Sequence, residues 1–218
     1  MSELNIDLHP AQLEIFKSNK RFKIVVAGRR FGKSYLSAWL LLINAIQSKS
    51  KDVFYIAPTF QQAKDIMWAM LKDLGQDLII QAYENTAVLT LINGRKIYLK
   101  GSDRPETLRG TGISYVVLDE YASMKPVVWE QIIRPSLADV QGRALFIGTP
   151  AGKNHFFDLY NDAIDDDEWD RFQFKSIDNP FLPATEIKAS KKNMSTMSFR
   201  QEFEASFETF SGGIFKEE

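Results

Sequence analysis

The chain has 218 residues, 44% of them hydrophobic and 25% charged, a composition typical of a folded globular domain. It has no cysteine, which excludes disulfides, a thiol nucleophile and a zinc–thiolate site. Its 27 basic and 28 acidic residues give a formal net charge of −1, so any contact with nucleic acid must come from a local basic patch or from several copies together.

Short apolar runs typical of buried strands alternate with helical patterns along the chain. In chain order we expect a strand at 23–27, a helix at 33–46, a strand at 53–57, a helix at 61–74, a hairpin formed by 86–91 and 95–99, a strand at 115–119, a helical segment at 127–137, strands at 144–148 and 171–177, and helices after Pro183. Asn93-Gly94 is a strong hairpin-turn signal, and Pro135 is expected to kink or split its helix. Strands separated by helices predict the α/β class, with a mostly parallel central sheet flanked by helices and a ligand site at its carboxyl edge.

A phosphate-binding loop is predicted between the first strand and the first long helix. Residues 27–34 read AGRRFGKS and match the pattern G-x-x-x-x-G-K-[ST], except that Ala27 takes the first glycine position. Glycines let backbone amides curve around phosphate oxygens, the lysine supplies a positive charge, the serine can bind Mg²⁺, and the helix directs its N-terminal dipole at the anion. The predicted nucleotide-binding residues of this loop are Gly28, Arg29, Arg30, Phe31, Gly32, Lys33 and Ser34.

Two adjacent acids follow the apolar strand 115–119. We expect Asp119 to hold Mg²⁺, mostly through water, and Glu120 to act as the general base that polarises the attacking water. An ordinary solvated turn is the alternative, but a buried strand that ends in an unpaired charge is costly. Two acids rather than one favour hydrolysis over nucleotide binding alone, so these residues predict an Mg²⁺-dependent nucleotide hydrolase with Lys33 among its catalytic residues.

Together these motifs resemble the ATPase domain of the large terminase subunits of tailed bacteriophages. The resemblance rests on the segments 9–12 (HPAQ), 28–34, 57–63 (APTFQQA), 108–110 (LRG), 116–120, 148–150 (GTP), 152–157 and 199–207. It implies a P-loop NTPase fold of the additional-strand (ASCE) type. The implied function is ATP-driven translocation of double-stranded DNA into a procapsid.

The resemblance also implies a domain organisation and a set of partners. Residues 1–210 would form the ATPase domain and 211–218 the start of a linker to a nuclease domain absent from this chain, so we expect no nuclease activity. The implied partners are double-stranded DNA, the portal and procapsid, the terminase small subunit, and further copies of the chain in a ring, all in the host cell cytoplasm. No stretch approaches the roughly 18 apolar residues of a membrane span, so no membrane is expected.

Further roles follow from the resemblance, each with a simpler alternative. Gln12 would contact adenine, or would be an ordinary polar residue of an N-terminal helix. Arg29 could contact the γ-phosphate in cis, although Arg29 and Arg30 could also be solvated loop residues. Arg104 and Arg109 are candidates for an arginine supplied to the neighbouring subunit, and either could instead face DNA or be structural.

The segment Gly148, Thr149 and Pro150 resembles the family's coupling motif. Thr149 would sense the γ-phosphate through its hydroxyl, while an ordinary turn at the end of a strand is the alternative.

Two other functions compete with the motor. A helicase-like DNA-dependent ATPase would share the segment 57–63, but a helicase core uses two such domains and this chain has one P-loop. A nucleotide-gated scaffold with little turnover would not need both Asp119 and Glu120.

Overall fold

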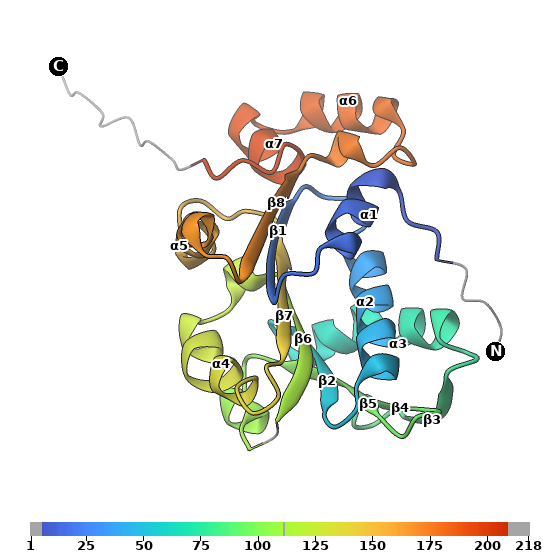
Figure 1. Cartoon of the computed structure of the whole chain (residues 1–218). Coiled ribbons are helices and arrows are strands. Elements are labelled where there is room, and N and C mark those ends of the chain that lie inside the picture. Colours follow the sequence, from blue (N-terminus) through green and yellow to red (C-terminus); the bar gives the residue numbers. More distant parts are fainter. Residues whose placement is uncertain (1–5, 111, 209–218) are drawn as a thin grey trace.

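The computed structural model describes residues 6–110 and 112–208, so the linker predicted at 211–218 lies outside the described residues. One eight-stranded sheet runs through the molecule in the order β3-β4-β5-β2-β6-β7-β1-β8 (Figure 1). The strands are β1 (Phe22–Ala27), β2 (Asp52–Ala57), β3 (Ile79–Tyr83), β4 (Val88–Leu91), β5 (Lys96–Gly101), β6 (Ile113–Asp119), β7 (Arg143–Gly148) and β8 (Trp169–Phe174).

The six strands from β5 to β8 in this order are parallel, and β3, β4 and β5 pair antiparallel. The hairpin predicted around Asn93-Gly94 is confirmed as β4 and β5, with Leu89 opposite Ile97. Strand β7 lies between β1 and β6, so an additional strand separates the P-loop strand from the strand that ends at Asp119. The predicted mostly parallel α/β sheet of the additional-strand type is confirmed.

Helices cover both faces of the sheet (Figure 1). One face carries α1 (Pro10–Lys17), α2 (Lys33–Gln47) and α3 (Phe60–Leu74), and the other carries η1 (Pro105–Leu108), η2 (Tyr121–Ser123), η3 (Val128–Ile133), α4 (Arg134–Ser136), α5 (His155–Asp162) and η4 (Ala163–Asp165). Because both faces are covered, a central strand such as β1 is buried at every position, which explains why its sequence is apolar except for Lys23, whose ammonium donates a 3.0 Å hydrogen bond to the Ile15 carbonyl.

The structure also has elements that the sequence patterns did not predict. Strand β3 extends the sheet edge with mostly exposed side chains, so it lacks the apolar alternation of a half-buried strand. Helix α5 spans only eight residues after its N-cap Asn154, too few for a clear helical period. The predicted helix 127–137 forms as one continuous segment, the π-helical turn η3 followed directly by α4, and Pro135 lies within α4 without splitting it.

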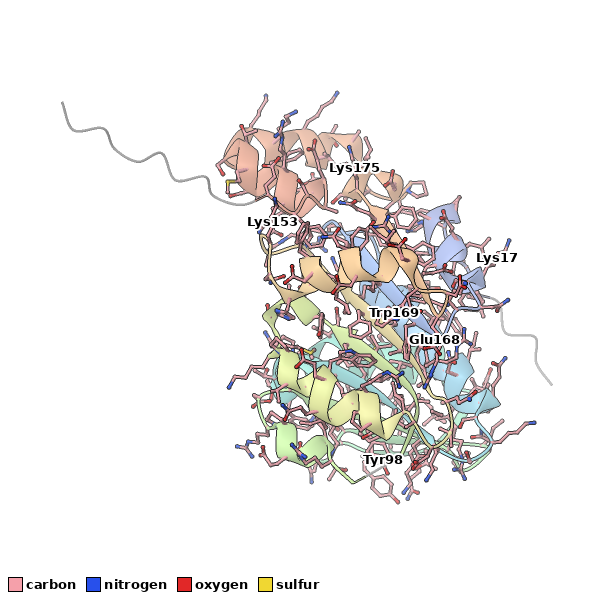
Figure 2. All side chains as sticks on the ribbon, turned by 60° about the vertical axis from the view of Figure 1, so that its left-hand side comes forward. Lys17, Tyr98, Lys153, Glu168, Trp169 and Lys175 are labelled. Atoms are coloured by element: carbon pink, nitrogen blue, oxygen red, sulfur yellow. The ribbon has the colours of Figure 1, made fainter. Side chains whose placement is uncertain are left out.

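The C-terminal segment lies across the end of the sheet at which β1 and β8 finish (Figure 1). It comprises η5 (Ser176–Asp178), α6 (Ala184–Asn193) and α7 (Thr196–Phe203). Figure 2 shows Lys153 and Lys175 at this end of the molecule and Tyr98 at the opposite end. No helix among residues 6–110 and 112–208 is both long and apolar enough to cross a bilayer.

Candidate nucleotide-binding site

The carboxyl ends of three neighbouring strands meet at one cavity of about 670 Å³. Strand β1 leads into the P-loop, β6 into Glu120, and β7 into Thr149. Residues 29–34 line the cavity together with Glu120, Thr149 and Pro150. The sheet therefore brings together the P-loop, the acidic pair and the coupling segment, which the sequence could only place in order along the chain.

The P-loop has two residues in the left-handed region. Gly32 has φ +96° and is the N-cap of α2, and Arg30 has φ +62°. A non-glycine residue in this region costs about 1–2 kcal/mol, so the surrounding structure must hold Arg30 there. Gly28 is needed for a different reason: a Cβ atom there would lie 2.5 Å from Ser176 Oγ and 2.8 Å from the carbonyl oxygen of Phe203.

Lys33 folds back over the loop. Its ammonium donates hydrogen bonds to the carbonyls of Ala27 at 3.0 Å and Gly28 at 3.1 Å, and to Thr149 Oγ1 at 3.0 Å. Burial lowers the pKa of Lys33, and the nearby carboxylates of Glu120 and Asp119 oppose that shift. The P-loop carbonyls therefore hold the positive charge of Lys33 at the wall of the cavity.

Asp119 lies behind the cavity wall and is 3% exposed. Its Oδ1 accepts a 2.9 Å hydrogen bond from the Glu120 amide, and its Oδ2 accepts one from the Tyr55 hydroxyl. Burial raises the pKa of Asp119, while the Tyr55 hydrogen bond and the charge of Lys33 oppose the rise. Sequence reasoning missed Tyr55, although the hydroxyl of a tyrosine inside a buried strand such as β2 usually has a hydrogen-bond partner.

Glu120 begins the turn after β6 with φ +51°, again in the left-handed region. This conformation departs from the strand and places the Glu120 side chain at the cavity, which Asp119 does not line. Burial and the Asp119 carboxylate raise the pKa of Glu120, and Lys33 and the Thr149 peptide oppose the rise. A carboxylate with a raised pKa is a better proton acceptor near neutral pH, as a general base requires.

Comparisons with known proteins identify the family. Residues 24–218 match the sequence model of "Terminase large subunit, T4likevirus-type, N-terminal". The chain belongs to this terminase family.

Individual relatives agree with this terminase assignment. The terminase large subunit of Escherichia phage T5 is 29% identical over 203 residues, 89% of this chain and 46% of that protein, and that of Thermus phage G20c is 24% identical over 95% of this chain and 50% of its own length. This chain therefore spans about half the length of these curated relatives.

The fold also matches solved terminase structures. The large terminase ATPase domain of Thermus phage P74-26 superposes with a TM-score of 0.80 at 23% identity, covering 92% of this chain and 94% of that one. The large terminase of a thermophilic bacteriophage, solved in complex with ADP, gives a TM-score of 0.80 at 16% identity, over 93% of this chain and 54% of that one. At these identities the likeness establishes the terminase ATPase fold.

The four arginines predicted for this terminase site occupy different places. Arg29 lies at the cavity rim, 66% exposed, in an ion pair with Glu202 of α7, and Arg30 also lines the cavity. Neither Arg104 nor Arg109 lines it. Arg104 borders a second hollow of about 430 Å³ that is also lined by Lys100, and Arg109 is the C-cap of η1.

Gln12 of α1 contacts the P-loop backbone. Its Nε2 donates a 2.9 Å hydrogen bond to the Gly32 carbonyl, and its Oε1 accepts one of 3.2 Å from the His9 amide. The side chain is buried and does not line the cavity. Gly148 brings the coupling segment close to Glu120, because a Cβ atom there would lie 3.3 Å from the Glu120 Cα.

Proposed function

We propose that this chain is the ATP-hydrolysing motor domain of a large terminase, which drives double-stranded DNA into a procapsid. One observation carries the hydrolytic part: Lys33 and Glu120 line one cavity, with Thr149 between them. Lysine neutralises phosphate charge and a carboxylate with a raised pKa accepts a proton, so the pair suits attack of water on a γ-phosphate. Membership of the terminase family supports the packaging role.

Side chains and backbone amides at the cavity would each have a separate role in binding and hydrolysing the nucleotide. The amides of the P-loop and the ammonium of Lys33 bind the β- and γ-phosphates, and Glu120 takes the proton of the attacking water. Thr149, bonded to Lys33 and adjacent to Glu120, adjusts both groups when the γ-phosphate leaves. Arg29 contacts the γ-phosphate in cis. Gln12, which does not line the cavity, supports the P-loop through the Gly32 carbonyl instead of contacting adenine.

The residues present fit a magnesium ion. Mg²⁺ takes oxygen ligands and usually keeps several waters beside substrate phosphates. Ser34 places a hydroxyl on the cavity, and the buried Asp119 can hold water through oxygens that each already accept one hydrogen bond. When bound, the ion would neutralise charge on the phosphates. In the described part of the chain, no group of three or more histidine or acidic side chains is arranged so that it could hold a metal ion by itself.

The proposed assembly is a ring of copies that act on DNA at the portal of a procapsid, with the terminase small subunit, in the host cytoplasm. Arg104 and Arg109 lie outside the cavity of their own chain, which supports a role for one of them in a neighbour's site. Such an arginine contributes about 10³–10⁵ in rate in other phosphate-transferring enzymes. A helicase-like ATPase and a scaffold are the other candidates, and no observation on the site favours either.

Replacing the general base tests the catalytic assignment. The variant Glu120→Gln is expected to keep binding ATP and to lose turnover by at least about a hundredfold, the scale of general-base catalysis. Lys33→Ala is the comparison that should lose binding as well. Unchanged turnover in Glu120→Gln would refute the role of Glu120, and slow turnover in both the wild type and the variant, with intact binding, would favour the scaffold.

A further inference from the structure

Four consecutive carbonyl groups of the P-loop accept hydrogen bonds from side chains far away in the sequence. Ser176 Oγ donates to Arg29 at 2.6 Å and Asn179 Nδ2 to Arg30 at 2.7 Å. On the other side, His9 Nε2 donates to Phe31 at 2.9 Å and Gln12 Nε2 to Gly32 at 2.9 Å. The His9 ring nitrogen is the donor, since a carbonyl oxygen can only accept.

Two N–H groups of the same loop, unlike its four carbonyls, have no hydrogen-bond partner among the described residues. They are the N–H groups of Arg30 and Gly32. Fixing each carbonyl fixes the orientation of its peptide plane and therefore the direction of the following N–H group. Concave sets of backbone N–H groups in turn conformations bind anions such as phosphate. Ser176 and His9 hold the carbonyls whose peptides carry the unpartnered N–H groups of Arg30 and Gly32. The peptide held by Asn179 carries the Phe31 N–H, which donates to the Gly28 carbonyl at 3.4 Å and closes the turn around Arg30.

Asn179 has the most demanding position of the four. It holds the carbonyl of Arg30, the loop residue in the left-handed region, where a side chain with a Cβ atom is disfavoured. The Asn179 side chain is itself fixed, because its Oδ1 accepts a 2.9 Å hydrogen bond from the Phe181 amide. Because the Asn179 amide group is held in place, its hydrogen bond keeps Arg30 from leaving the left-handed conformation.

We propose that Asn179 is a positioning residue, which holds Arg30 in its left-handed conformation and so keeps the unpartnered N–H groups of Arg30 and Gly32 aimed at the phosphate of the bound nucleotide. Asn179 does not line the cavity and acts only through the P-loop backbone. The proposal rests on the proposed nucleotide site and adds a determinant of affinity outside it. The segment 176–179 belongs to the link between β8 and α6, so it also ties the P-loop to the C-terminal helices.

The first test measures the restraint without nucleotide. Hydrogen exchange of the Phe31 amide, which donates to the Gly28 carbonyl and belongs to the peptide held by Asn179, is expected to be faster in Asn179→Ala than in the wild type. Asn193→Ala, at the end of α6, is the matched control and should leave that exchange unchanged. Unchanged exchange in Asn179→Ala would overturn the proposal, whatever the activity of the protein.

The second test measures fluorescently labelled ADP binding in the presence of Mg²⁺. Asn179→Ala is expected to weaken binding about threefold to tenfold, the range for loss of one hydrogen bond. Wild-type affinity in this variant would overturn the proposal. A wild-type chain that binds no nucleotide would overturn the proposed function itself and this inference with it.

A third comparison distinguishes positioning from a general loss of stability. Arg30→Ala and Arg30→Gly both lack the guanidinium, but only alanine keeps the penalty of the left-handed conformation. Asn179→Ala should therefore weaken ADP binding in the Arg30→Ala background and have a clearly smaller effect in the Arg30→Gly background. Gln141→Gly is the control for the general effect of placing a glycine at a left-handed position, because Gln141 is an exposed left-handed residue in the turn before β7. Equal losses in both Arg30 backgrounds would contradict the positioning role.

Discussion

The ammonium of Lys33 donates a 3.0 Å hydrogen bond to the hydroxyl of Thr149, which lies 116 residues further along the chain. The contact is possible because β1 and β7 are neighbours in the sheet and finish at the same edge. It joins the lysine of the P-loop to the residue whose peptide adjoins Glu120. A γ-phosphate that binds Lys33 would compete with this hydrogen bond, so Thr149 is placed to respond to the state of the nucleotide.

Removing the Thr149 hydroxyl tests this relationship. Thr149→Val keeps the shape of the side chain and is expected to lower kcat about tenfold with little change in ADP affinity, because one hydrogen bond near the reacting group is lost. Thr149→Ser keeps the hydroxyl and should retain most of the rate. A wild-type kcat in Thr149→Val, measured by steady-state phosphate release, would show that the contact has no part in turnover.

The hydrogen bond from Tyr55 to Asp119 predicts an effect on both stability and pH dependence. Tyr55→Phe should lower the free energy of unfolding by about 1.5–3 kcal/mol, the range for hydrogen bonds to charged groups. Because this bond lowers the pKa of Asp119, its loss should raise that pKa and shift the acidic limb of the rate profile to higher pH.

Tyr115→Phe is a matched control for Tyr55→Phe. The Tyr115 hydroxyl is also buried, on β6, but has no partner among the described residues. Its removal should leave stability unchanged or slightly higher. Equal losses of stability in the two variants, measured by urea unfolding, would contradict the role given to the Tyr55 hydroxyl.

The raised pKa of Glu120 predicts that ionisation of this carboxyl, which a general base requires, lowers the stability of the folded chain. A carboxyl whose pKa is raised in the folded state favours folding least at high pH, since ionisation is harder in the folded than in the unfolded chain. Its contribution is most favourable below its ordinary pKa of 4.5 and is lost as the pH rises to the folded value. Glu120→Gln should therefore raise Tm at pH 7 more than at pH 4. Glu106→Gln, at an exposed glutamate, should show no such difference.

The arginine supplied by a neighbour can be tested by mixing variants. Arg104→Ala and Arg109→Ala are each mixed with Lys33→Ala, whose own site is inactive but whose arginines are intact. The variant lacking the shared arginine should have little activity alone, and activity should return in the mixture because its intact site receives an arginine from the other chain. If mixing restores neither variant, the shared-arginine model fails for both residues.

The local motifs and their order were predictable from the sequence, and the contacts between them were not. The P-loop could be predicted from the short segment 27–34, because strand, glycines, lysine and helix are consecutive in the chain. The Tyr55–Asp119 contact depends on strand order, which places β2 beside β6 with Tyr55 next to Val117. Residues 117 and 119 face the same side of their strand, and only the paired register shows that Tyr55 faces it too.

The support of the P-loop by Ser176 and Asn179 was still less accessible to sequence analysis. These residues are 147 and 149 positions away from the carbonyls that they bind. No periodicity or motif relates such distant positions, and the sequence of their segment indicates only the end of a strand and the approach to a helix. Their role follows from the three-dimensional position of the C-terminal segment over β1 and β8 (Figure 1).

Steady-state ATP hydrolysis over a series of protein concentrations, with Lys33→Ala as the blank, tests the central claim most directly. A motor that completes its site with a neighbour's arginine should show activity that rises faster than linearly with concentration and is abolished in the blank. Activity that is strictly linear with concentration would contradict the shared site and favour Arg29 acting in cis. Activity no higher than the blank at any concentration would contradict the proposed ATPase.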